Sequence, residues 1–435
     1  MGHLLNGKFI AQGLALAVSA VMVTGAHAGK TEQEQIQQLR KEIESLKSMV
    51  QQQNQVQQQQ QVQIAEVKAQ PQVIAPSTKP ASPFSMKSKG GAEINLYGFV
   101  RGDANYILEG ADDDFGSVHK STGATKDKLR ATAKTTRLGL DFNTPVGDDK
   151  VGGKVEVDFA GNGANENLRI RHAYLTLNNW LFGQTTSNFL AGHAPEMIDF
   201  ATNIGGGTTR IPQVRYGLNL APQTQLFIAA EEGNSKAGMA TLADVEGAAA
   251  DLKYRLPVLT AKLTQGFADG KGTATARVLA ENYKSETAKD DKTGWGIAVG
   301  ANYQLTDPLK VFADFTHVKG NSNYMYGSNS AYVVDANNNI KQNEFNAAQV
   351  GATYKVLPNL RTTLAYGGMF ADDDNGYAKA NQLGNEKVQQ AWLNVIYSPA
   401  KPIDLGVEYI NGKRETFAGK SYKDNRVGLM AKYSF

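Results

Sequence analysis

The 435-residue chain contains no cysteine, which excludes disulfide bonds and thiolate metal sites. Proline is scarce at 13 residues, whereas glycine is frequent at 44. The formal net charge of +3 is too balanced for a protein that binds nucleic acid through bulk phosphate attraction. Beyond the N-terminus no apolar run approaches the roughly 18 residues of a candidate transmembrane helix. Any function that uses charge must therefore depend on where individual charged residues lie.

The N-terminus has the organisation of a signal peptide. Lys8 precedes an apolar stretch from Phe9 to Thr24, and Ala26-His27-Ala28 fits the small-x-small pattern of a cleavage site. The alternative is an uncleaved membrane anchor, but the apolar stretch is shorter than the roughly 20 residues that a spanning helix needs. We therefore expect residues 1–28 to be removed during export.

Residues 29–68 form a Gln- and Glu-rich segment with heptad spacing, which predicts an α-helical coiled coil in the periplasm. The alternative, a disordered Gln-rich tract, does not account for this spacing. Isoleucine at the a positions with leucine at d favours two strands, which conflicts mildly with the trimer expected below. Glutamine layers within the repeat weaken the coil. The apolar a and d positions are Ile36, Leu39, Ile43, Leu46, Val50, Ile64 and Val67.

Residues 69–91 are rich in proline, which predicts an extended linker. From residue 92 to Phe435 the dominant pattern is period-two alternation of apolar and polar residues. The last strand shows it best, because Leu429 and Tyr433 share one face while Arg426 and Lys432 share the other. Charges at such spacing would be costly in a solid core, but a water-filled interior removes that cost. We therefore expect an all-β membrane protein, with a transmembrane β-barrel over residues 92–435.

Turn-forming residues separate the predicted strands and allow them to be counted. Seven short turns and eight longer loops predict sixteen antiparallel strands, enough to enclose an aqueous channel. The stretch 274–283 is compatible with a strand or a loop, and counting it as a loop keeps the number of strands even. Porins of this size are usually trimers, and the coiled coil gives a second reason to expect a homotrimer. The predicted short turns lie near 143–150, 178–180, 219–223, 256–258, 305–308, 356–359 and 398–402.

The third long loop, about 188–209, occupies the place where trimeric porins fold a loop into the lumen. Its Gly205-Gly206-Gly207 run permits tight backbone bends. We expect this loop to constrict the lumen, the alternative being an ordinary outer loop.

Basic residues on predicted inward faces concentrate around this loop. Guanidinium groups keep their charge and match carboxylates bidentately, so a cluster of them would concentrate anions. The alternative is a neutral network with the lumen acids Asp103, Asp141, Glu156, Asp158 and Asp251, and the sequence leaves both open. The predicted substrate-binding residues are Arg137, Arg169, Arg171, Arg210 and Arg215, with Arg101, Lys253 and Arg255 as additions.

The chain resembles the DcaP-like family of trimeric outer-membrane channels. The similarity rests on the Gln-rich heptads, on LYGFVRGDANY in the first barrel strand, and on LRIRHAYLTLNN and RIPQVRYG around the third loop. This resemblance implies passive uptake of small anionic solutes, especially dicarboxylates, through an arginine-lined constriction, and no cofactor. It assigns that constriction to Arg169, Arg171, Arg210 and Arg215, and less directly to Arg137. The expected partners are a second and third copy of the chain, outer-membrane lipid and lipopolysaccharide.

Two other functions, catalysis and a structural role, are the alternatives to transport. A barrel enzyme needs a nucleophile, a base and an orienting group brought together, but the histidines at 119, 172, 193 and 317 are scattered and also lack metal-site spacing. We expect no catalysis, and a rim or interface position for His172. A structural role, in which the coiled coil braces the membrane against the cell wall, is compatible with transport.

Overall fold

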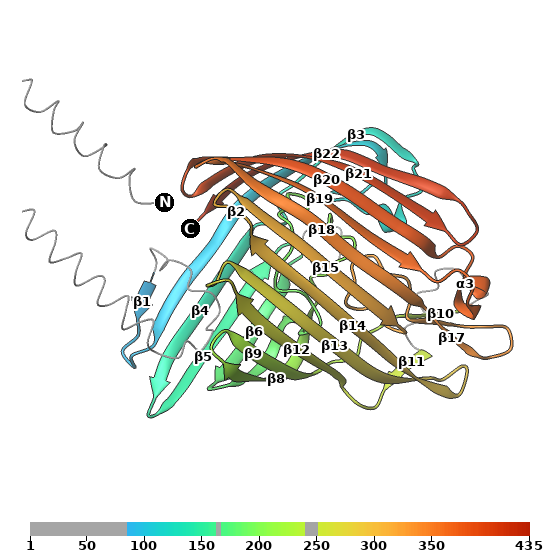
Figure 1. Cartoon of the computed structure of the whole chain (residues 1–435), viewed down its shortest axis with the longest axis horizontal. Helices are drawn as coiled ribbons and strands as arrows, with labels where there is room; N and C mark the ends of the chain where they lie inside the picture. The colour runs from blue at the N-terminus through green and yellow to red at the C-terminus, as the bar shows by residue number, and fades with distance from the viewer. Residues whose placement is uncertain (1–84, 162–166, 240–250) are drawn as a thin grey trace, which may run out of the picture. The chain divides into compact units, whose positions relative to one another are not determined.

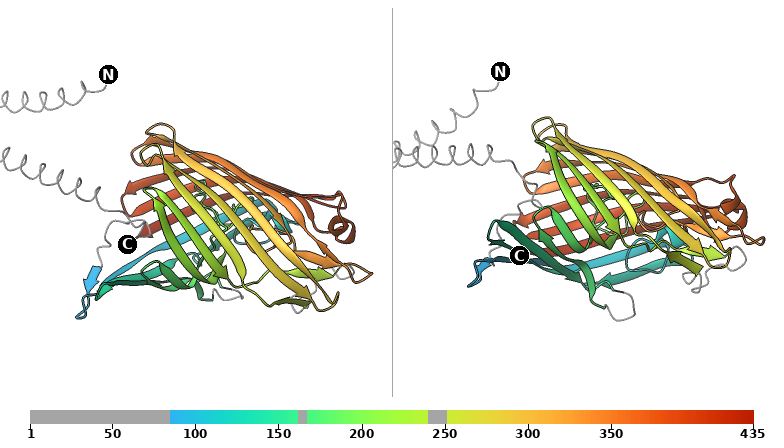
Figure 2. Two further views of the ribbon diagram at one scale, coloured as in Figure 1. Left: turned by 60° about the horizontal axis from the view of Figure 1, so that its bottom comes forward. Right: turned by 90° about the horizontal axis from the view of Figure 1, so that it is seen from below.

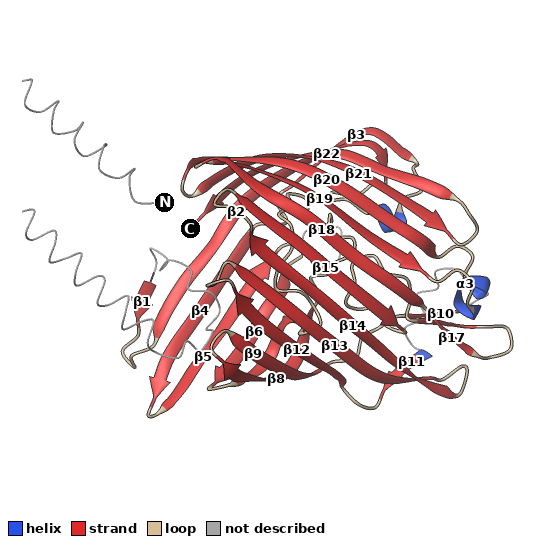
Figure 3. Ribbon diagram, viewed as in Figure 1, coloured by secondary structure: helices blue, strands red, loops and turns tan. Residues whose placement is uncertain are grey.

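The computed structural model describes residues 85–161, 167–239 and 251–435. The predicted signal peptide, the coiled coil and most of the linker lie outside these described residues. The rest forms one large antiparallel sheet that closes on itself (Figure 1). Figure 3 shows that strands make up nearly all of its regular structure. The barrel strands in order are β2 (Glu93–Gly110), β3 (Thr125–Thr132) with β4 (Arg137–Val146), β5 (Asp149–Asp158), β6 (Arg169–Leu177), β7 (Trp180–Thr186), β8 (Arg210–Ala221), β9 (Thr224–Glu231), β11 (Leu252–Tyr254) with β12 (Val258–Phe267), β13 (Gly272–Ser285), β14 (Asp290–Gln304), β15 (Leu309–Lys319), β18 (Glu344–Leu357), β19 (Leu360–Ala371), β20 (Asn385–Ala400), β21 (Ile403–Thr416) and β22 (Ser421–Ser434).

The predicted number of sixteen barrel strands is confirmed. The sheet has 19 strands, of which β1 (Ser85–Lys87) is only a short addition beside β2. Two pairs count as one strand each, because β3 and β4 follow each other along β2, as β11 and β12 do along β13. Closure occurs between β2 and β22, and Gly98 exchanges two backbone hydrogen bonds, at 3.0 and 3.1 Å, with the terminal Phe435.

One predicted turn is wrong, and one predicted loop is a strand. Residues 256–258 interrupt a single barrel strand rather than joining two, because β11 and β12 both pair with β13. The turn that follows lies at 268–271, and the segment 274–283, left open between strand and loop and counted as a loop, belongs to β13. These two errors offset each other, so the strand number is unchanged. The other six predicted short turns are confirmed.

Alternation along the strands separates an apolar outer face from a polar inner face, as predicted. On β22, Leu429 and Tyr433 are 53% and 51% exposed, whereas Arg426 is 0% and Met430 7% exposed. In a membrane the exposed apolar side chains meet lipid, and the closed sheet leaves no open edge there. Figure 2 shows the inclined strands of this barrel in two further orientations.

Long loops pack inside one half of the barrel. Phe189, Leu190 and Ile204 of the third loop form an apolar cluster with Tyr324 and Met325 of a later loop. Beside the barrel sheet lies a three-stranded sheet of β10 (Ala237–Met239), β16 (Tyr332–Val334) and β17 (Ile340–Gln342). Two short helical turns lie wholly within the described ranges, η1 (Val118–Lys120) and α3 (Gly376–Ala380). None of the helices in this part of the chain has the length and apolar character needed to cross a membrane.

Candidate functional site

The third loop leaves β7, returns to β8, and crosses the barrel interior between them. Glu408 of β21 accepts hydrogen bonds from the backbone N–H groups of Ile198 and Asp199, both at 2.9 Å. Gln349 of β18 donates to Asn203 at 2.9 Å. Because β18 and β21 lie on the far side of the ring from β7 and β8, the loop spans the lumen. The prediction that this loop folds inward is confirmed.

Glycines allow the loop to lie against neighbouring backbone. Gly205 has a φ of +81°, and a Cβ there would collide with the Ala348 carbonyl oxygen of β18. A Cβ on Gly207 would collide with the Tyr324 carbonyl oxygen of the later loop. Both contacts require glycine, which explains the glycine run in the sequence.

Two carboxylates on β5 organise three of the predicted arginines. Asp158 accepts from Nε and Nη2 of Arg169 at 2.9 and 2.6 Å, and from Nη1 of Arg171 at 2.8 Å. Glu156 accepts from Nε of Arg171 at 2.8 Å and lies 3.4 Å from Nε of Arg137. Arg171 therefore joins the two carboxylates. We call Arg137, Arg169, Arg171 and Arg210, with Glu156 and Asp158, the arginine cluster.

A bulge between β5 and β6 sets the direction of Arg171. Glu156 pairs with His172 while Val157 pairs with Ile170, which leaves Arg171 without a partner in the register. The extra residue lets consecutive side chains turn to the interior, since His172 also lies 3.9 Å from Glu156. His172 is therefore part of the interior wall, not a rim residue as expected.

Arg210, at the start of β8, completes the cluster, and no carboxylate in the described part of the chain forms an ion pair with it. It interacts electrostatically with Arg171, Arg137 and Arg169, all of like charge, and with Glu156. Its buried Nε has no hydrogen-bond partner in the described part of the chain. Four guanidinium groups against two carboxylates leave a net charge of +2 when all are ionised.

The remaining predicted basic residues lie elsewhere. Arg215 interacts with Tyr174 and Glu231 rather than with the cluster. Arg101 forms a buried ion pair with Asp103 and donates to the Ile198 carbonyl, so it anchors the third loop. Lys253 pairs with Glu286 at 3.3 Å on an exposed face, because the neighbouring Tyr254 is the residue that points inward.

Arg255 is exposed in the bend after β11. Sequence reasoning missed Lys262 and Phe227, which lie on inward faces near Arg215. The alternation of β12 would have identified Lys262, since it shares a face with buried Val258 and Thr260.

The third loop carries two buried titratable groups. Burial raises the pKa of Asp199 to about 6, against the favourable field of Arg426. Burial also lowers the pKa of His193, whose Nε2 lies 3.7 Å from Asp314. Across the described ranges no three His, Asp or Glu side chains are grouped to hold a metal ion.

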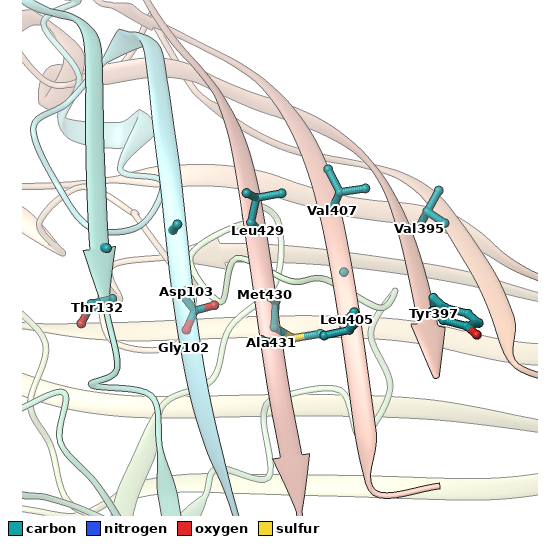
Figure 4. A pocket seen from close by; sticks show the side chains of 13 residues that line it. Gly102, Asp103, Thr132, Val395, Tyr397, Leu405, Val407, Leu429, Met430 and Ala431 are labelled. Carbon is teal, nitrogen blue, oxygen red and sulfur yellow. The ribbon is translucent and has the colours of Figure 1, made fainter. Parts of the chain in front are cut away.

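An apolar depression lies on the outer wall rather than in the lumen. It is lined by outward-facing side chains of β20, β21 and β22, and by small residues of β2 and β3 (Figure 4). Leu429, Val407 and Val395 stand side by side there (Figure 4). Gly102 and Ala104 of β2 also line the depression. This surface faces lipid or another protein and takes no part in the lumen.

Comparison with known proteins supports a channel. No curated protein matches the chain. The crystal structure of the outer membrane channel DcaP of Acinetobacter baumannii is 69% identical over 80% of this chain and 99% of that chain, with a TM-score of 0.77.

Two more distant structures share the fold alone. The anion-selective porin from Comamonas acidovorans is 14% identical over 79% of this chain and 100% of that chain, with a TM-score of 0.52. Salmonella typhi OmpF in complex with daunomycin is 14% identical over 81% of this chain and 100% of that chain, with a TM-score of 0.55.

The family model of the DcaP outer membrane protein matches residues 22–435. This chain therefore belongs to the DcaP outer membrane protein family and is a β-barrel channel of the Gram-negative outer membrane, not an enzyme.

Proposed function

We propose that the channel conducts small anionic solutes, dicarboxylates in particular, by passive diffusion past an arginine-lined constriction. The supporting observation is Arg210, whose guanidinium has no carboxylate partner among the described residues and lies near three other arginines. Such a group attracts an anion more strongly than a paired one, because no internal carboxylate competes for its donors.

The composition of the cluster suits passage rather than tight binding. Glu156 and Asp158 neutralise about half of its charge, and Arg169, with its side chain 45% exposed, remains in contact with water. A conducting site must attract an anion strongly enough to admit it and weakly enough to release it. The third loop narrows the lumen, which concentrates the field of the remaining positive charges. A dicarboxylate would use both of its ends, one on Arg210 and one on Arg137.

The test is block of single-channel current by succinate in planar bilayers, with uncharged succinamide as the control solute. Succinate should reduce the small-ion current in a concentration-dependent way, and succinamide should not. Arg210→Gln should weaken the block about tenfold, the loss expected for one charge-assisted contact. Arg255→Gln, which removes an exposed arginine outside the lumen, is the matched control and should leave the block unchanged. Equal block of the wild type and Arg210→Gln would contradict the arginine assignment.

We also propose that the chain assembles as a homotrimer. The heptads within residues 29–68 and the outer apolar depression both support self-association. Sedimentation of the full mature chain in detergent tests this, and a monomeric mass would contradict it. Deleting residues 30–90 separates transport from a bracing role, because conductance should survive that deletion.

A further inference from the structure

A second pair of cations lies on the lumen wall, away from the arginine cluster. Lys262 of β12 and Arg215 of β8 both contact the ring of Phe227 on β9. Nζ of Lys262 is 5.9 Å and Cζ of Arg215 is 5.2 Å from the ring centroid. Within the described residues, neither cation has a carboxylate inside the 4.0 Å of an ion pair.

The carboxylate that interacts with both cations already accepts three hydrogen bonds. Glu231 interacts electrostatically with both Lys262 and Arg215. Its Oε1 accepts from the Asn188 backbone N–H at 3.0 Å and from the Thr260 hydroxyl at 2.6 Å, and its Oε2 accepts from the Tyr324 hydroxyl at 3.0 Å. These bonds hold the carboxylate in the wall and away from both cations.

Lys262 also stands directly opposite another cation. Its register partner on β13 is Arg277, and like charges in such a pair destabilise a sheet. Arg277 forms an ion pair with Asp314 at 2.5 Å and donates a hydrogen bond to the Phe189 carbonyl oxygen at 3.3 Å. Lys262 therefore carries a positive charge that neither neighbour compensates.

The pair lies deeper in the barrel than the arginine cluster. Arg215 is five residues beyond Arg210 on β8, about 16 Å along the strand and towards the short turns. Gly217 makes room for the ring between the cations, because a Cβ there would lie 3.0 Å from Cε1 of Phe227. Phe227 thus fixes where the two cations are presented.

We propose that Arg215, Lys262 and Phe227 form a second subsite that binds one carboxylate group of a passing solute, between the constriction and the short-turn end of the barrel. The subsite rests on the proposed anion transport and adds a step to it. A solute leaving the arginine cluster meets a second weak site of the same charge, and successive weak sites speed conduction. The apolar part of the solute would lie beside the Phe227 ring.

Block from each side of the membrane tests the subsite. Succinate added on the short-turn side reaches Lys262 before it reaches the arginine cluster. Lys262→Gln should therefore raise the half-blocking concentration about fivefold from that side, the size expected for the loss of one screened charge, and leave block from the loop side unchanged. Lys262→Arg should restore the block. Lys253→Gln, which removes an exposed lysine outside the lumen, is the matched control.

Each outcome decides between the two proposals. A side-specific loss in Lys262→Gln with rescue by Lys262→Arg supports the second subsite. Unchanged block from both sides in Lys262→Gln, with normal block of the wild type, overturns the subsite and leaves the proposed function standing. Absence of succinate block in the wild type overturns the proposed function itself.

Discussion

Arg361 holds Glu196 through both carboxylate oxygens, with its Nε 2.8 Å from Oε2 and its Nη2 2.9 Å from Oε1. The pair ties the third loop to β19, on the far wall of the barrel. The same loop residue is held a second time, because its carbonyl oxygen accepts from Nε1 of Trp392 at 3.1 Å and from Nδ2 of Asn394 at 2.9 Å. The loop is therefore fixed by several independent contacts.

This redundancy predicts a mild effect for Arg361→Gln. The ion pair is partly exposed and contributes no more than about 1 kcal/mol, while both bonds to the Glu196 carbonyl remain. Open-channel current noise should increase, and mean conductance should rise by less than about twofold. Single-channel recording measures both quantities. A loss of all constriction, seen as a severalfold rise in conductance, would mean that this pair alone holds the loop.

The glycine contacts predict a larger effect. Gly207→Ala places a methyl group against the Tyr324 carbonyl oxygen, so the third loop must move away from the loop that covers it. We expect conductance to change and the folded barrel to unfold at a lower temperature. Gly192→Ala in the same loop is the control, because nothing lies within 4 Å of a Cβ at that position. Equal behaviour of the two variants would show that the Gly207 contact is unimportant.

Arg171 and Arg210 should differ in their effects on stability. Arg171 is buried and bonds to both Glu156 and Asp158, so Arg171→Gln removes two charge-assisted hydrogen bonds, although Asp158 keeps Arg169, and should cost about 2 kcal/mol of unfolding free energy. Arg210 has no such partner in residues 85–161, 167–239 and 251–435, and Arg210→Gln removes repulsion among like charges. Urea titration of the barrel in lipid vesicles measures both costs. A larger loss for Arg210→Gln than for Arg171→Gln would be inconsistent with the observed pairing.

Asp199 predicts a pH-dependent component of stability. Burial raises the pKa of Asp199 from 3.8 to about 6, with Arg426 opposing this rise and Asp424 and Glu408 nearby. The folded state therefore binds this proton more tightly than the unfolded state does. The stabilisation is present below pH 3.8 and is lost as the pH rises towards about 6.

Comparison with Asp199→Asn isolates this component. The variant stays neutral at every pH, so its unfolding temperature relative to the wild type should increase as the pH rises through that window. Thermal unfolding at a series of pH values provides the measurement. A constant offset between the two proteins would rule out a raised pKa at Asp199.

The fold was predictable where lipid lies on one side of a strand and water on the other. β22 alternates cleanly, and its faces and the overall strand number follow from the sequence. The sequence pattern did not identify β13 as a strand, because its inward face mixes charged Arg277 and Glu281 with apolar residues. Those apolar residues are Leu279 and Tyr283. Leu279 packs against loop side chains inside the barrel. Where loops fill the lumen, the inner face is no longer purely polar and the period-two contrast is lost.

The sequence predicted which type of residue lines the site, but not which of these residues lie together. Sequence alternation identified inward arginines, yet it does not report which carboxylate each one meets. Glu156 and Asp158 bind three of them only because β5 lies between β4 and β6 and a bulge redirects Arg171. Arg215 was grouped with the others although its position on β8 places it about 16 Å from Arg210 along the strand.

The reversal potential under a KCl gradient tests whether the net positive charge of the arginine cluster selects anions. The reversal potential of the wild type should have the same sign as the equilibrium potential of chloride. The double variant Arg137→Gln, Arg210→Gln should shift it towards the potassium value, because Glu156 and Asp158 then balance the remaining Arg169 and Arg171. A cation-selective wild type, or identical reversal potentials in the two proteins, would contradict the account.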